Sequence, residues 1–341
     1  MKKAFLGLLI LLIIASGGLY TFYIQSLKSM EQGDSVIVEI PKGSSTKTIG
    51  QVLEKNGLIH NGFTFALYVR KQGKGSQLQA GKYQFTRGES VDQIIDRLVE
   101  GDVYVSTTPI TIPEGYTVAQ IADFLTEKGL VNKEEFLKEV NHGDFPYEFV
   151  KQIPKDRATK YRLEGYLFPK TYELREGITA HEIITMMLDQ FQQEWDPSWQ
   201  EKLKSNGLTL HDAITLASIV EREVVVDKER PIVAGVYFNR LAGDIMLQAD
   251  ATIQYALGNQ KAKLTYKDLE LDSLYNTYKY KGLPPGPIAS PGIKSIEAVV
   301  QPQKNHYLFY VTKKDGSGEH YFSETYQQHL HNIALSKKQK K

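Results

Sequence analysis

The chain has 341 residues, of which 41% are hydrophobic and 24% are charged, a composition typical of a folded protein large enough for two domains. Its 41 basic and 40 acidic residues give a formal net charge of +1, so no bulk electrostatic attraction for nucleic acid is expected. It contains no cysteine, which excludes disulfides, thiolate metal sites and a cysteine nucleophile.

The first segment of the chain is an uncharged, largely apolar run at residues 4–27, preceded by Lys2 and Lys3. Its length and charge pattern predict a single transmembrane helix within residues 1–30. The N-terminus would then be cytoplasmic, and the rest of the chain would lie on the outer side of the cell membrane. A cleaved signal peptide is the alternative, because small residues stand at 15–18. The apolar run continues beyond them, which favours a retained anchor.

A pattern of glycines repeats after this segment. Each glycine is followed six residues later by isoleucine and ten residues later by leucine or methionine. This spacing predicts strand–turn–helix units, and their unequal separations argue against a solenoid. The glycines are Gly43, Gly88, Gly115 and Gly177.

The unit at residues 115–122 resembles the LysM module, a small carbohydrate-binding unit that recognises chains containing N-acetylglucosamine. A generic strand–turn–helix unit would produce much of the same pattern. We expect an α+β fold with a small LysM-like α+β region at residues 34–102, a larger α+β catalytic domain at residues 103–333 and a basic tail at residues 334–341.

A helix with acidic residues near its end is predicted at residues 209–223. Thr209 and Asp212 have the spacing of a capping box. The apolar side chains share one face, and Glu221 and Glu223 lie on its two margins. A partly desolvated carboxyl group at such a margin keeps its proton near neutral pH and can act as a general acid. The alternative is an ordinary amphipathic helix with solvated acids, and periodicity does not choose between the two glutamates.

Two other segments have the composition of a sugar-binding site. In the first, Glu164 lies among aromatic residues, and the alternative is an acid paired at the surface. The second is rich in proline and glycine, and its rings and amides can stack on a pyranose and bind its hydroxyl and acetamido groups. Such loops also often only cross a surface. The candidate residues of this second segment are Gln248, Tyr275, Asn276 and Tyr278.

Several ordered blocks of sequence resemble the endolytic murein transglycosylases of the YceG-like group, which are membrane-anchored bacterial enzymes acting on peptidoglycan glycan strands. The resemblance implies a LysM-like part followed by a catalytic domain. It also implies that Glu221 is the catalytic acid. The blocks are residues 163–169, 216–223, 236–241, 246–250, 275–278 and 282–288.

The reaction implied by this resemblance is cleavage of the β-1,4 bond between N-acetylmuramic acid and N-acetylglucosamine without water, leaving a 1,6-anhydro end. One glutamate suffices, because it can protonate the leaving oxygen and then take the proton of the sugar's C6 hydroxyl. Glu164 would orient substrate or support the fold, the loop residues would bind substrate, and no metal or cofactor is expected. Expected partners are peptidoglycan strands, the membrane, and peptidoglycan synthases (penicillin-binding proteins) with the elongation machinery. The alternative function is a non-catalytic peptidoglycan-binding scaffold.

Overall fold

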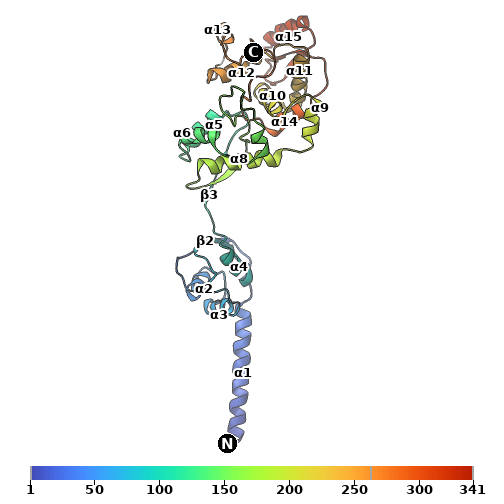
Figure 1. Ribbon diagram of the computed structural model, residues 1–341. Coiled ribbons are helices and arrows are strands. Elements are labelled where there is room, and N and C mark those ends of the chain that lie inside the picture. The colour runs from blue at the N-terminus through green and yellow to red at the C-terminus, as the bar shows by residue number, and fades with distance from the viewer. Residues whose placement is uncertain (1, 262, 340–341) are drawn as a thin grey trace. The chain divides into compact units, whose positions relative to one another are not determined.

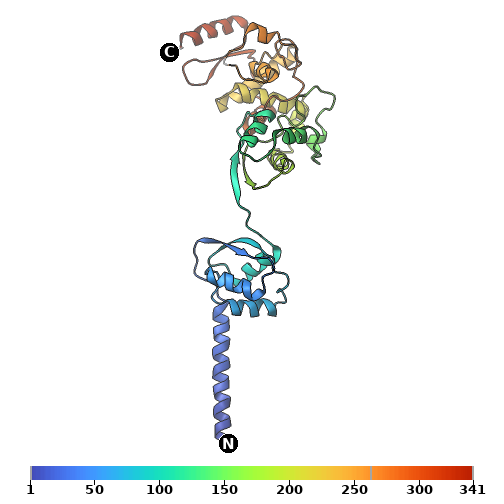
Figure 2. The same cartoon turned by 90° about the vertical axis from the view of Figure 1, so that its left-hand side faces the viewer.

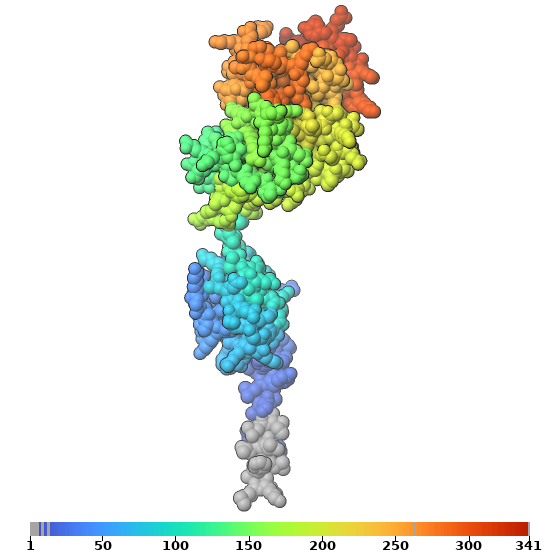
Figure 3. Space-filling model, viewed as in Figure 1, coloured from blue at the N-terminus to red at the C-terminus, as the bar shows by residue number. Residues whose placement is uncertain are grey.

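The computed structural model describes residues 2–261 and 263–339. The chain divides into two units, Met1–Ser106 and Thr107–Lys341, each with its own hydrophobic core. Both units combine helices with short antiparallel strand pairs (Figures 1 and 2). Figure 3 shows the two units in space-filling form, coloured along the chain.

The first unit begins with helix α1 (Lys2–Ser26). Within the part of the chain that the structure describes, no helix combines the length and the apolar character needed to cross a membrane. The prediction of an N-terminal transmembrane helix is therefore wrong.

The remainder of the first unit consists of two strand–turn–helix repeats around one antiparallel strand pair, in which Ser35 lies opposite Thr86. Helices α2 and α3 cross closely. A Cβ atom on Gly62 would lie 2.5 Å from the carbonyl carbon of Gly50, so only glycines allow this contact. The elements are β1 (Ser35–Ile40), α2 (Thr46–Lys55), α3 (Gly62–Lys71), β2 (Gly81–Thr86) and α4 (Val91–Glu100).

The second unit contains the other two repeats and a predominantly helical part (Figure 1). Strands β3 and β4 pair with each other, as do β5 and β6. The elements are β3 (Thr107–Thr111), α5 (Val118–Glu127), α6 (Lys133–His142), α7 (Glu148–Lys151), β4 (Thr171–Arg175), α8 (Ala180–Glu194), α9 (Trp199–Ser205), α10 (Leu210–Glu223), the 3-10 turn η1 (Asp227–Glu229), α11 (Arg230–Ala242), α12 (Asp250–Leu257), α13 (Tyr266–Leu269), α14 (Ile293–Val300), β5 (Phe309–Thr312), β6 (His320–Ser323) and α15 (Tyr326–Lys338).

All four repeats have the form that the glycine spacing predicts. In each, the glycine has a positive φ between the strand and the helix, a conformation that favours glycine. The isoleucine and the leucine or methionine that follow are buried in the hydrophobic cores. The four units are β1–α2, β2–α4, β3–α5 and β4–α8.

Helix α10 is the central helix of the second unit and packs against α11, α12 and α14. It starts at Thr209 with the predicted capping box, completed by Asp212. From Leu210 to Val220 every residue except Asp212 is buried, so the helix is covered on all sides rather than along one apolar stripe. Only its last turn, which carries Glu221 and Glu223, leaves the core.

Candidate active site

Glu221 lies in the last turn of α10, and its side chain is 7% exposed. Its Oε2 atom accepts hydrogen bonds from the hydroxyl of Ser295 at 2.8 Å and from the backbone N–H of Gly292 at 3.0 Å. The Nη1 atom of Arg230 lies 3.1 Å from the same oxygen. Within residues 2–261 and 263–339, no hydrogen bond is made to Oε1. The contacts therefore fix the carboxyl group by Oε2 and leave Oε1 without a hydrogen-bond partner among the described residues.

The groups that hold Glu221 come from the starts of two helices. Gly292 is the N-cap of α14, and Ser295 is in its first turn, so the positive end of the helix dipole faces the carboxylate. Arg230 begins α11, where Asp227 accepts from its Nε at 3.2 Å and Ser295 accepts from its Nη1 at 2.5 Å. Asp227 and Ser295 therefore fix the orientation of the guanidinium group that pairs with Glu221.

A second carboxyl group, that of Glu114, lies beside Glu221 in the turn between β3 and α5. A Cβ atom on Gly292 would lie only 2.0 Å from Oε1 of Glu114, so this carboxyl group packs directly against the Cα atom of Gly292. Desolvation, and then the charge of Glu221, raise the pKa of Glu114. No pattern in the sequence singled out Glu114. Its position before Gly115 is a weak signal, because Glu176 holds the same position in the fourth repeat.

Glu223 lies in different surroundings from Glu221. Its Oε2 accepts from the hydroxyl of Tyr310 at 3.2 Å, and its Oε1 accepts a longer bond from the N–H of Ala251 at 3.4 Å. Burial raises the pKa of Glu223, and the charge of Asp250 adds to this effect. The two acids that periodicity could not separate therefore belong to different clusters, and Glu221 is the one bound to an arginine.

Glu164 is buried, with 1% exposure. Its Oε1 accepts from the N–H of Val118 at the start of α5, and its Oε2 accepts from the hydroxyl of Tyr255, both at 2.9 Å. Burial raises the pKa of Glu164 to about 7. Both carboxyl oxygens bind protein groups, so Glu164 joins α5 to α12, and the alternative of a surface ion pair is wrong.

The four loop candidates divide into buried and accessible residues. Asn276 is fully buried, and its Nδ2 donates to the carbonyl oxygens of Leu269 and Leu271, both at 2.8 Å. Tyr275 is 5% exposed. Gln248 is exposed, with a φ of +50°, and the half-buried Tyr278 donates through its hydroxyl to Asp250 at 2.5 Å. The structure thus places Tyr278 with Asp250, on the Glu223 side of α10.

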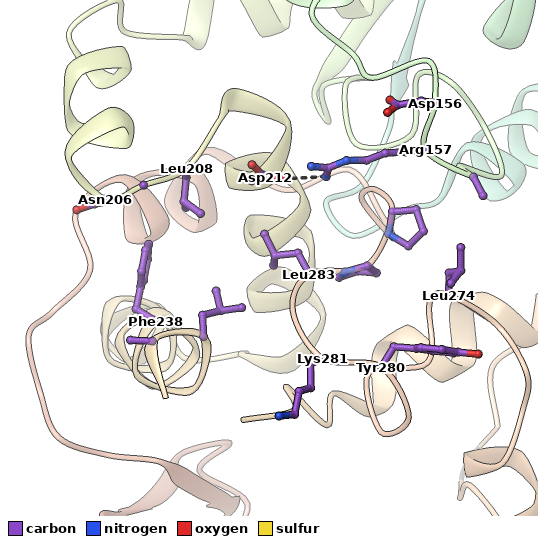
Figure 4. A pocket seen from close by; sticks show the side chains of 16 residues that line it. Asp156, Arg157, Asn206, Leu208, Asp212, Phe238, Leu274, Tyr280, Lys281 and Leu283 are labelled. Carbon is purple, nitrogen blue, oxygen red and sulfur yellow. Dashed lines mark hydrogen bonds and ion pairs between the residues drawn. The ribbon is translucent and has the colours of Figure 1, made fainter. Parts of the chain in front are cut away.

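Two cavities lie along α10. One, of about 880 Å³, opens beside Asp212 near the start of the helix, where Arg157 pairs with Asp212 at 2.9 Å (Figure 4). Asp212 and Glu221 are nine residues apart, or about 14 Å along the helix, so this cavity is not at the glutamate. The other, of about 140 Å³, lies beside the last turn and is lined by Lys160 and Arg222 among others.

Across the described residues, no cluster of three or more histidine, aspartate or glutamate side chains is placed to hold a metal ion.

Comparison with known proteins identifies the family. The YceG-like family model matches residues 38–335. An endolytic murein transglycosylase of Bacillus subtilis (strain 168) is 34% identical over 322 residues, which cover 92% of this chain and 88% of the relative. An endolytic murein transglycosylase of Streptococcus pneumoniae serotype 2 (strain D39 / NCTC 7466) is 34% identical over 360 residues, which cover 97% of this chain and 65% of the relative.

A solved structure of a YceG-like protein is also similar to this chain. The crystal structure of a YceG-like protein from Listeria monocytogenes is 37% identical to this chain, with a TM-score of 0.58, and the match covers 87% of this chain and 98% of that one. These similarities confirm the resemblance inferred from the sequence blocks. The chain belongs to the YceG-like family.

Proposed function

We propose that this protein is an endolytic murein transglycosylase that cleaves peptidoglycan glycan strands without water, with Glu221 as its catalytic acid and base. Membership of the YceG-like family and the names of the relatives support the activity. The observation that carries the assignment of Glu221 is its geometry. Three donors hold one carboxyl oxygen at the end of a buried helix, and the other oxygen has no partner among the described residues.

The proposed reaction breaks the β-1,4 bond between N-acetylmuramic acid and N-acetylglucosamine. A carboxyl proton goes to the leaving oxygen, and the C6 hydroxyl of the muramyl sugar attacks C1 and loses its proton to a carboxylate. The product is a 1,6-anhydro end, and no water is consumed. A carboxyl group held by Arg230, Ser295 and Gly292 suits this role, because a fixed position reduces the entropy cost of reaching the transition state.

The proposed substrate also suggests a location and partners. Peptidoglycan lies outside the cytoplasmic membrane, so we propose that Thr107–Lys341 works there. The repeats at residues 34–102 would bind glycan, and peptidoglycan synthases with the elongation machinery would supply new strands. Retention of the protein on insoluble peptidoglycan, compared with a variant lacking residues 34–102, tests the binding role. Equal retention of the two proteins would contradict it.

Substitution of Glu221 tests the catalytic assignment. Glu221→Gln keeps the size of the side chain but removes the transferable proton, so cleavage of glycan strands should fall by about 10²–10⁴-fold. Glu223→Gln is the matched control, because it makes the same change two residues away in the other cluster, and most of the activity should remain. Wild-type activity in Glu221→Gln would reject the assignment. Binding without cleavage by the wild-type protein would favour the scaffold function.

A further inference from the structure

The cavity beside the last turn of α10 has a role that the proposed reaction does not yet use. Its lining comes from the start of α5, from the end of α10, and from α12 with the loop after it. Its volume of about 140 Å³ is that of roughly five water molecules in the liquid, so it holds a small group but not a whole sugar. Polar side chains of its lining are Gln120, Lys160, Arg222, Gln254 and Asn259.

Two cations line this cavity, and within residues 2–261 and 263–339 neither forms an ion pair. The Nζ atom of Lys160 lies over the rings of Tyr161 and Tyr255, at 5.8 Å and 5.6 Å from their centroids. The Nη1 atom of Arg222 donates to the carbonyl oxygen of Gly115 at 3.1 Å. A guanidinium has five N–H donors, so this single bond positions Arg222 and leaves donors for a ligand.

The carboxyl groups around these cations do not neutralise them. Asp123, which also lines the cavity, is already paired with a lysine outside it. Burial raises the pKa of Glu164 and of Glu223, the two other acids on which the charges of these cations act. Both groups therefore carry less negative charge than solvated glutamates at the same pH, and the cavity has an excess of positive charge.

The cavity adjoins the proposed catalytic glutamate at Gly115. A Cβ atom on Gly115 would lie 3.5 Å from Nη1 of Arg222 and 3.8 Å from Cγ of Glu221, so both side chains contact the same glycine. Arg222 also follows Glu221 directly in α10. A sugar bound at Glu221 can therefore place one of its substituents against Arg222.

We propose that this cavity binds a carboxylate carried by the C3 substituent of N-acetylmuramic acid, and that it thereby selects the sugar whose bond is cut. This inference rests on the proposed function. N-acetylglucosamine has only a hydroxyl group at C3, whereas N-acetylmuramic acid has a lactyl ether, and the free lactyl group is about the size of the cavity. In intact strands the lactyl carboxyl is joined to a stem peptide, which carries carboxylates of its own.

Lys160 and Arg222 are suited to this ligand, because hydrogen bonds between a cation and a carboxylate are among the strongest in proteins. A muramyl sugar seated by its carboxylate presents its own glycosidic bond to Glu221. N-acetylglucosamine in the same place leaves the cations without a partner. The cavity is therefore a specificity site, and its residues take no part in the proton transfers.

The test compares three forms of one glycan strand. These are intact strands with stem peptides, peptide-free strands with free lactyl carboxylates, and peptide-free strands whose lactyl carboxylates have been converted to methylamides. Cleavage is measured as kcat/KM with the wild-type protein, and binding is measured by titration calorimetry in the Glu221→Gln background. Conversion to the methylamide should cost about 10-fold in both, the low end for a charged hydrogen bond because Lys160 is exposed.

Substitutions of Lys160 connect this preference to the cavity. Lys160→Gln should lose about 10-fold on strands with carboxylates and match its parent protein on the methylamide strands. Lys160→Arg keeps the charge and should retain the preference. Lys128→Gln is the matched control, because Lys128 lies over the ring of Phe124 at 5.6 Å but does not line the cavity, and it should change nothing. The strand form on which Lys160→Gln loses affinity identifies the lactyl or the peptide carboxylate as the ligand.

The outcomes separate this inference from the proposed function. An equal loss by Lys160→Gln on all three strands would make Lys160 a structural residue, and no loss on any strand would remove it from binding. Either result would overturn the inference and leave the proposed function intact. Failure of the wild-type protein to cleave any strand would instead reject the proposed function, while calorimetry would still test the carboxylate site. Thermal melting of each variant verifies that a loss is not a loss of fold.

Discussion

The buried carboxyl group of Glu164 should make the second unit less stable as the pH rises. In the folded protein burial raises its pKa from the ordinary 4.5 to about 7, whereas in the unfolded chain the group is solvated and ordinary. Between these two values the unfolded chain has lost the proton and the folded chain still holds it, so the free energy of unfolding falls with pH. The stabilisation is fully present below pH 4.5 and is lost once the pH passes about 7.

Glu164→Gln should remove this dependence. The amide oxygen can still accept from the N–H of Val118, and the amide N–H₂ can donate to the hydroxyl oxygen of Tyr255. Each pKa unit corresponds to 1.36 kcal/mol, so the difference between 4.5 and about 7 amounts to about 3 kcal/mol. The free energy of unfolding of Glu164→Gln minus that of wild type should therefore rise by about 3 kcal/mol from about pH 4 to about pH 9.

Urea unfolding followed by tryptophan fluorescence measures this gain. The chain's 2 tryptophans, Trp195 and Trp199, belong to the same unit as Glu164, so the signal reports on that unit. Glu176→Gln serves as an exposed control and should not change the pH dependence. If the difference between Glu164→Gln and wild type were the same at both pH values, the buried-carboxyl explanation would be refuted.

Three further substitutions test other contacts. Gly292→Ala should melt near wild type but lose part of its activity, because the new Cβ atom would lie 2.0 Å from the Glu114 carboxyl group and disturb the residue whose N–H holds Glu221; unchanged activity would contradict the role of that contact. Asn276→Ala should lower the free energy of unfolding in urea by about 2–4 kcal/mol, since the carbonyl groups of Leu269 and Leu271 lose the buried amide as their donor, and a loss below about 1 kcal/mol would count against that role. Gln248→Gly should raise it by about 1 kcal/mol, because the φ of +50° strains a residue with a Cβ atom, and a loss of stability would show that the side chain contributes more than the strain.

The sequence was most informative about local structure. The glycine spacing predicts all four strand–turn–helix units, and Thr209 with Asp212 predicts the start of α10. The prediction that α10 buries a single apolar stripe was wrong. The hydroxyl groups of Thr215 and Ser218 form hydrogen bonds within the helix itself, so these polar residues can also be buried. Thr215 donates to His211 O at 2.7 Å, and Ser218 donates to Thr215 O at 2.7 Å. Polar residues can therefore stand on the covered faces of a buried helix.

The sequence was least informative about contacts between distant segments. Glu221 meets Arg230, Ser295 and Glu114, which lie on separate elements, and no local pattern links them. Asn276 differs from its prediction in another way. Its amide lies in a proline-rich loop and was predicted to bind substrate, but the side chain is fully buried. In the structure this amide donates to the carbonyl groups of Leu269, at the end of α13, and Leu271, just after it, where the backbone has no helix or strand partner to supply a donor.

The fate of water in the reaction tests the central claim most directly. Glycan strands would be digested by the wild-type protein in ¹⁸O-labelled water and the new ends analysed by mass spectrometry, with Glu221→Gln as the blank. The proposed mechanism predicts 1,6-anhydro-muramyl ends without label, because the attacking oxygen is the sugar's own C6 hydroxyl. Reducing ends that carry ¹⁸O would show hydrolysis and would contradict the mechanism.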